Sequence, residues 1–296
     1  ISVYRMETVA AQPASSTQQL VESVCRNFTH WAAHSAHAPV PGEVLPGGYN
    51  HHVQLIEAKA QRWVVRIDRR TRDSVQREQE VALQMQAAAC KLAPTIAFSD
   101  PRRGITVMEW IPGQPDAAGG CAALVRLLQK IHALTPPDKA LRSSDVLRDY
   151  LATVDPGSPL GVLIRGENPQ IAKAMNDIDE AVNINPVLCH NDLLRANRIQ
   201  GPQHLYALDW EYAALGDPLF DLAVCASEMQ TDTVDKFLEL YLQRKASTAE
   251  SQRFAAQRLI YACIEACWFS VHRSHSEEAR QAFENLAHAL DQGFAQ

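Results

Sequence analysis

Three polar residues, Asp192, Asn197 and Asp209, carry side chains suited to phosphoryl-transfer chemistry. The segment VLCHNDLLRANRI contains His190, Asp192 and Asn197 in the order H-x-D-x-x-x-x-N, and Asp209 follows after the apolar run 205–208. Phosphoryl transfer needs magnesium to hold the phosphates and a carboxylate near the attacking hydroxyl. Magnesium prefers hard oxygen ligands. Asn197 and Asp209 supply a pair of such ligands.

Ordinary structural roles are the alternative for these acids, because Asp often caps helices and ends strands. The combined spacing of Asp192, Asn197 and Asp209 favours a site. Further on, Gly216-Asp217-Pro218 predicts a helix that begins with Asp217 as its N-cap. Asp221 lies one turn into this otherwise apolar helix, so we expect it to be buried and to brace the loop that carries Asp192.

The composition restricts the class of protein. The chain has 296 residues, of which 46% are hydrophobic, and a formal net charge of -6. This charge argues against nucleic acid and against anionic membrane surfaces as partners. We find no apolar run of about 20 residues and no signal peptide, and nothing that requires a protein partner. We therefore expect a soluble cytoplasmic protein whose seven cysteines are mostly buried free thiols.

Strand and helix patterns divide the chain into two parts. Residues 1–111 are predicted to form a β-rich lobe with an opening helix at 17–34, a hairpin over 53–67, a helix at 73–89 and two strands near 95–98 and 105–110. Residues 112–296 are predicted to be mostly helical, with short strands flanking the motif near 187–210. The fold class is therefore α+β, with a small N-terminal lobe and a larger C-terminal lobe.

The motifs resemble those of the aminoglycoside phosphotransferase and choline kinase superfamily. The blocks that carry the resemblance are VLCHNDLLRANRI, LDWEYAALGDPLFDLA, QRWVVRID and VMEWIPG. The resemblance implies a protein-kinase-like bilobal fold, with ATP between a five-stranded N-terminal lobe and a helical C-terminal lobe. It also implies that ATP and Mg²⁺ are needed for the reaction.

The same resemblance implies roles for individual residues. Asp192 would be the base that orients the acceptor hydroxyl, and Asn197 and Asp209 would be the magnesium ligands. Arg66 would lie over the phosphates, where protein kinases commonly have Lys. Its partner on the following helix would be Glu80, with Glu78 as the alternative.

The resemblance also implies nucleotide contacts in the N-terminal lobe. The backbone from Glu109 to Ile111 would meet the adenine edge, and the turn containing Gly47 and Gly48 would lie over the phosphates, because glycine lets the backbone approach closely. His190 would hold the catalytic loop rather than carry a proton. Ala196 stands where relatives commonly have Gly before the metal-binding Asn.

The acceptor is expected to be a small cationic alcohol. The block DWEYA matches the thiamine kinase and choline kinase branch, and Glu211 and Tyr212 within it follow directly on Asp209, so we expect both to face the acceptor and Glu211 to contact a cation. In IEACWFSVHR, Glu265 and Trp268 share a helix face with Tyr261 and His272. Such a face suits a quaternary nitrogen. The alternative is that Trp268 belongs to the core and that Glu265 lies on the surface.

The resemblance therefore favours thiamine as the acceptor. Choline or ethanolamine is the nearest alternative, and an aminoglycoside comes next. A non-catalytic nucleotide-binding scaffold is the alternative from a different class, and the presence of Asp192, Asn197 and Asp209 together argues against it.

Overall fold

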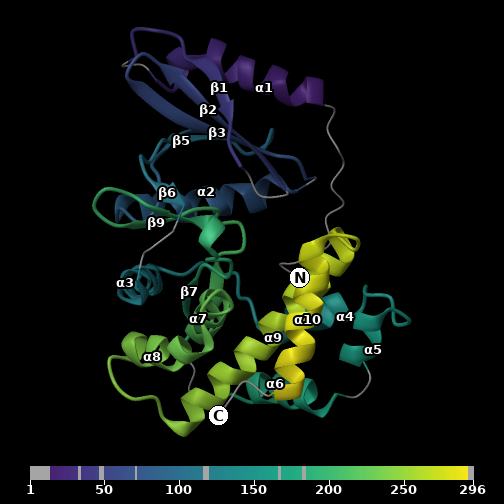
Figure 1. Ribbon diagram of the computed structural model, residues 1–296. Coiled ribbons are helices and arrows are strands. Elements are labelled where there is room, and N and C mark those ends of the chain that lie inside the picture. The colour runs from purple at the N-terminus through teal and green to yellow at the C-terminus, as the bar shows by residue number, and fades with distance from the viewer. Residues whose placement is uncertain are drawn as a thin grey trace. The chain divides into compact units, whose positions relative to one another are not determined.

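The structure, a computed structural model, describes residues 14–32, 35–46, 50–70, 72–115, 120–165, 168–181 and 185–292. Their contacts divide them into two units (Figure 1). The sheet unit holds the described residues from 14 to 115 together with Ala196–Glu211, and the helical unit holds those of Gly120–Arg195 and those from Tyr212 onward. The motif-bearing segment is thus shared, since Asp192 belongs to the helical unit and Asn197 to the sheet unit.

The sheet unit is built on a five-stranded sheet in the order β1-β2-β3-β5-β4, in which each neighbouring pair is antiparallel. Its strands are β1 (Val40–Val44), β2 (His51–Ala58), β3 (Gln61–Asp68), β4 (Ile96–Asp100) and β5 (Ile105–Glu109). The β2–β3 hairpin has the two-residue turn 59–60, and its register pairs His51 with Asp68 and Val53 with Arg66. Cross-strand partners point to the same face of a sheet, so these four side chains share one face.

The opposite face of this sheet carries the apolar core of the unit. Helix α1 (Ala14–Arg26) lies across the strands in Figure 1 and buries Val21, Val24 and Cys25 against Ile56, Val65, Ile67, Ile105 and Val107. The alternation along β3 follows from the strand period of two residues. Val65 and Ile67 face α1, and Arg66 and Asp68 therefore face away from it.

Helix α2 (Ser74–Ala89) follows β3 and precedes β4 in the sequence of the sheet unit. The Asp73 side chain caps it by accepting a hydrogen bond from the amide of Val75 at 3.1 Å. Its buried residues are Glu80, Leu83, Gln84 and Ala87, which follow the spacing of one helix face. Glu80 is therefore on the buried stripe of α2.

A second, three-stranded sheet joins the motif segment to the same unit. β6 (Gln114–Pro115) pairs with β8 (Arg198–Gln200), which pairs with β9 (Leu205–Ala207). The amide of Ala207 also donates to the carbonyl of Leu92 at 2.8 Å. All of residues 112–296 are predicted from the sequence to belong to the C-terminal lobe, whereas the contacts of Ala196–Glu211 group this segment with the sheet unit.

The helical unit surrounds a short antiparallel ladder of β7 (Val187–Cys189) and β10 (Ala214–Gly216). Its helices are α3 (Cys121–His132), α4 (Ser143–Leu151), α5 (Pro159–Arg165), α6 (Pro169–Asp179), α7 (Pro218–Ala226), α8 (Thr231–Leu242), α9 (Thr248–His272) and α10 (Glu277–Gln292). Helix α7 begins as predicted, because the Asp217 side chain accepts from the amide of Leu219 at 3.0 Å and Pro218 follows it. Ser247 and Glu250 form a capping box at the start of α9.

The predicted α+β class, with one β-rich and one mostly helical part, is confirmed. The opening helix is shorter than predicted: α1 ends at Arg26, and a separate 3-10 helix covers Phe28–His30. All seven cysteines are free, and Cys90 is exposed. Among the described residues, no helix combines the length and the apolar character that crossing a bilayer requires.

Candidate active site

Arg66 lies between two carboxylates of the sheet unit. Its Nη2 contacts Oε1 of Glu80, and its Nη1 donates to Oδ1 of Asp209 at 2.6 Å. Glu80 is buried, whereas Glu78 on the same helix is exposed. Of the two acids considered as partners of Arg66, Glu80 therefore forms the ion pair.

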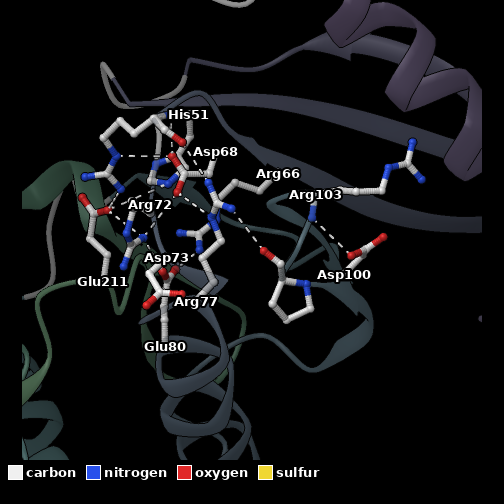
Figure 2. Close-up of polar contacts among 12 residues, drawn as sticks. His51, Arg66, Asp68, Arg72, Asp73, Arg77, Glu80, Asp100, Arg103 and Glu211 are labelled. Carbon is white, nitrogen blue, oxygen red and sulfur yellow. Dashed lines mark hydrogen bonds and ion pairs between the residues drawn. The ribbon is translucent and has the colours of Figure 1, made fainter. Parts of the chain in front are cut away.

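Around this arginine, four cations and four anions form a group that we call the arginine–acid cluster. Its members are Arg66, Arg70, Arg72, Arg77, Asp68, Glu80, Asp209 and Glu211. Figure 2 shows several of them converging from β3, α2 and the segment after β9. Buried charges are tolerated when each has an opposite partner, and here the charges balance.

Asp209 and Asn197 flank the same end of the β8–β9 ladder. Arg198 pairs with Ala207, and the amide of Leu208 donates to the carbonyl of Asn197 at 2.9 Å. Asp209 then adopts a left-handed backbone conformation with φ of 61°, which turns the chain directly after the strand. A carboxylate and an amide oxygen at one end of one ladder fit the ligands that magnesium prefers.

The charges around Asp209 set its protonation state. Burial alone would raise the pKa of its carboxyl, but the adjoining His51 ring and the guanidinium groups of Arg66 and Arg70 outweigh burial and lower the pKa below its ordinary value. The carboxylate is therefore ionised at neutral pH. An ionised carboxylate is the form that binds a divalent cation.

In the helical unit, the loop that carries Asp192 leaves β7 through a strained residue. Asn191 has φ of 65°, and its side-chain amide donates to the carbonyl of Tyr212 at 2.9 Å. Leu193 is fully buried, and its carbonyl accepts from the Cys225 thiol at 3.4 Å. The apolar residues of the motif thus anchor the loop, and Asp192 between them stays half-buried.

Asp221 braces this loop from α7. Its side chain is completely buried, and it accepts hydrogen bonds from the amides of His190 at 2.8 Å and Asn191 at 2.5 Å. Nε2 of His132 lies 3.0 Å from the same carboxylate, and Nδ1 of His132 lies 2.7 Å from the Tyr241 hydroxyl. The carboxylate therefore satisfies two backbone donors that the loop presents, which fixes the path of the chain ahead of Asp192.

The C-terminal end of the loop is held by Glu228. Its Oε2 accepts from the amide of Arg195 at 2.8 Å, and its carbonyl accepts from the guanidinium of Arg195 at 3.1 Å. Burial, followed by the electrostatic effects of Cys267 and Asp192, raises the pKa of the Tyr150 hydroxyl. Helices α4 and α9 thus adjoin the loop within the helical unit.

Glu265 lines a groove of about 390 Å³ between α9 and α10, together with Phe269, Glu277, Glu278, Gln281, Ala282 and Asn285. Burial raises the pKa of its carboxyl to about 7, and the nearby negative charge of Glu228 adds to this effect. Trp268 is half-buried and stacks edge-on against Phe269, with 5.1 Å between ring centroids. Small-molecule pockets typically measure about 300–1,000 Å³, so the groove has room for a small ligand.

The expected nucleotide contacts stay predictions. Gly47 and Gly48 are outside the described residues. The amide of Glu109 donates to the carbonyl of Thr95 at 2.8 Å within the sheet, so the predicted contact with an adenine edge would use other backbone groups of the segment, including those of Ile111.

Glu211 lies within the arginine–acid cluster. Its side chain is buried, and its carboxylate contacts Nη2 of Arg70 and lies 3.5 Å from Nη1 of Arg72. Its contact with a cationic acceptor stays a prediction. Tyr212 belongs to the helical unit, and its contact with an acceptor stays a prediction.

Sequence reasoning overlooked His51, the arginines after β3 and His132. The signal for His51 is the hairpin register, because a two-residue turn pairs it with Asp68 on the face of Arg66. The spacing of Glu80, Leu83 and Ala87 distinguishes Glu80 from Glu78 in the same way. His132 lies 89 residues before Asp221 in the chain, and no local pattern connects the two.

Comparisons with known proteins agree on one family. The sequence pattern of the phosphotransferase enzyme family (APH) matches residues 42–256. The LicA protein of Haemophilus influenzae is 32% identical over 109 residues, which cover 34% of this chain and 40% of LicA. The match thus spans about two fifths of the relative's length.

Solved structures share the fold over nearly the whole chain. A choline/ethanolamine kinase family protein from Mesorhizobium loti superposes with a TM-score of 0.72 at 19% identity, and the match covers 92% of this chain and 94% of that one. Choline kinase LicA from Streptococcus pneumoniae gives a TM-score of 0.71 at 18% identity, with 94% and 100% covered. The expected kinase-like fold is thereby confirmed.

Replacement of Glu80 tests the cluster that holds Asp209. We predict that Glu80→Gln lowers the free energy of unfolding by about 3 kcal/mol, because it leaves the buried guanidinium groups of Arg66 and Arg72 short of one negative charge. Glu78→Gln on the same helix is the control, with a change within about 0.5 kcal/mol. Urea unfolding followed by tryptophan fluorescence measures both, and equal stabilities of the two variants would contradict the arrangement.

Proposed function

Since this chain belongs to the phosphotransferase enzyme family, as its motifs indicated, we propose that it is an ATP- and magnesium-dependent kinase that phosphorylates the hydroxyl of a small cationic alcohol. The observation that carries the proposal is the Arg66 guanidinium, which is held by Glu80 and in contact with Asp209. A cation fixed beside a carboxylate that can bind a metal is the arrangement that nucleotide phosphates need.

The residues of the sheet unit account for nucleotide binding in this proposal. Asn197 and Asp209 would hold the magnesium ion, which would neutralise charge on the phosphate oxygens. Arg66 forks onto the phosphates as a planar donor. The arginine–acid cluster keeps Arg66 oriented, because Glu80 occupies one side of the guanidinium.

The residues of the helical unit act on the acceptor. Asp192 accepts the proton of the acceptor hydroxyl as its oxygen bonds to the γ-phosphorus and the bond to the β–γ bridging oxygen breaks, which releases ADP. Asp221 and Glu228 keep the loop in place at its two ends. Both act by accepting hydrogen bonds from the loop backbone.

We propose the groove at Glu265 as the site for the positive charge of the acceptor. The carboxylate lies next to aromatic rings, and a carboxylate with aromatic neighbours attracts an organic cation. Thiamine is the first acceptor to test, because Glu265 stands where choline kinases usually have the first of two tryptophans. The size of the groove accommodates a ring as well as a small ammonium group.

Choline is the second candidate. The supporting observation is the similarity to LicA proteins, one of which, from Streptococcus pneumoniae, is a choline kinase. Choline is smaller than thiamine and would leave part of the groove to water. The two acceptors share a quaternary nitrogen and a primary alcohol, so the proposed chemistry is the same for both.

The direct test is ATP consumption with magnesium against thiamine, choline, ethanolamine and kanamycin, with the phosphorylated product identified by mass. We expect turnover of thiamine or choline and a product heavier by one phosphoryl group. Turnover of kanamycin alone would contradict a cationic-alcohol acceptor of this size. A protein that binds nucleotide but phosphorylates none of the four would favour the scaffold alternative.

The ionisation of Glu265 should make acceptor binding depend on pH. Its carboxyl has a pKa of about 7, and a cationic acceptor favours the ionised form, so the KM for the acceptor should fall as pH rises from 6 to 8. Glu277 and Glu278 line the same groove. A hydrogen bond with Arg280 is the main cause of a lowered pKa for Glu277, and a hydrogen bond with its own backbone is the main cause of a lowered pKa for Glu278. Both therefore stay ionised over this range.

Glu265→Gln should remove this pH dependence and raise the KM at pH 8 roughly 2- to 30-fold, which corresponds to about 0.5–2 kcal/mol of lost attraction. Glu284→Gln, at an exposed residue of α10 that does not line the groove, is the control. Steady-state kinetics at fixed ATP measure all three proteins. A KM profile of the Glu265 variant that parallels wild type would remove Glu265 from the acceptor site.

A further inference from the structure

His51, the first residue of β2, lies between two carboxylates of the arginine–acid cluster. Its Nδ1 is 3.5 Å from Oδ2 of Asp209, and its Nε2 is 3.9 Å from Oε2 of Glu211. The His51 side chain is only 2% exposed. Figure 2 shows it on the side of the cluster where Glu211 meets the arginines.

The fold places His51 there through the hairpin register. His51 is the cross-strand partner of Asp68, and Arg66 is two residues before Asp68 on the same strand. Residues two apart on a strand share a face, so the imidazole and the Arg66 guanidinium leave the sheet on the same side. They meet Asp209 through different oxygens, since Arg66 donates to Oδ1 and His51 faces Oδ2.

His51, Asp209 and Glu211 offer ligand atoms within 4.8 Å of one another, which is compatible with a metal site. The geometry favours another role. The two ring nitrogens face different carboxylates, and Arg66 already donates to Asp209. Glu211 is moreover engaged by Arg70 and Arg72.

We propose that His51 is a positioning residue for Asp209. The Nδ1 edge of the ring and the Arg66 guanidinium together hold both oxygens of the Asp209 carboxylate, which restricts its rotation. Glu211, itself held by Arg70, faces the Nε2 edge of the ring at 3.9 Å. This inference rests on the proposed function in taking Asp209 as a magnesium ligand, and groups behind a metal ligand commonly set its orientation.

Isosteric replacements separate the two edges of the ring. Asn at position 51 keeps an N–H near the place of Nδ1 and loses Nε2, whereas Gln places its amide nearer to Nε2. We expect His51→Asn to bind Mn²⁺ in the presence of ADP within about threefold of wild type. His51→Gln and His51→Leu should weaken the binding roughly 10- to 100-fold, as loss of groups behind a metal ligand does.

His52→Gln is the matched control. His52 is the next residue of β2, is half-buried and contacts Gln54 at 3.0 Å and Arg69 at 3.3 Å instead of the cluster's acids. Titration of Mn²⁺ followed by electron paramagnetic resonance gives the affinities, with thermal melts to confirm folding. The assay requires neither acceptor nor turnover, so a wrong assignment of the reaction or of the acceptor does not affect its result.

Three results would overturn the proposal. The first is wild-type Mn²⁺ affinity in the Gln and Leu variants, and the second is a folded Asn variant that binds as weakly as the Leu variant. The third is a nitrogen hyperfine coupling to Mn²⁺ in the wild-type protein that His51→Leu removes, since this would make the imidazole a direct ligand. The third measurement uses the wild-type protein and remains decisive even if a variant fails to fold.

Discussion

The contact of Arg66 with both Glu80 and Asp209 is the interaction on which the sheet unit's part of the site depends. An isolated carboxylate buried in protein is costly and tends to become protonated. Here the Arg66 guanidinium is shared by two carboxylates, and Arg70 and Arg72 pair with Glu211 and Asp68 in the same way. The cluster thus keeps Asp209 negative without a bound ion, and it does so with residues from β3, α2 and the segment after β9.

The helical unit also contains a buried carboxylate, which it stabilises in a different way. Asp221 is buried without an arginine, and its charge is satisfied by two backbone amides and by His132. Hydrogen bonds from backbone donors stabilise an ionised carboxylate. Because those donors belong to the segment immediately before Asp192, neutralising Asp221 also fixes the loop. One buried acid in each unit therefore positions a residue that we assign to the reaction.

The sequence was informative where a local period or motif defines the role. The helix cap at Asp217, the β-rich and helical division of the chain and the positions of Asp192, Asn197 and Asp209 relative to strands all follow from short patterns. The stripe of Glu80, Leu83 and Ala87 would also have selected Glu80 over Glu78. These features depend on residues near one another in the chain, so the sequence of each segment is enough to predict them.

Features that depend on distant partners were not predictable in this way. Glu211 looks like a free acid beside a metal ligand, but Arg70 neutralises it from 141 positions away. His51 needs the hairpin register before its relation to Arg66 is visible. Strand β1 was overlooked because Pro41 and Gly42 lie within it, and both residues are unfavourable in strands.

The central claim is that Asp192 performs the chemistry while the sheet unit binds the nucleotide. The most direct measurement is a comparison of wild type and Asp192→Asn for turnover of the acceptor and for affinity for magnesium and ATP. We predict that the variant loses at least about 100-fold in kcat, as expected for removal of a positioned base, and binds the nucleotide within about threefold of wild type. Turnover close to wild type, or an equal loss of nucleotide affinity, would contradict this account.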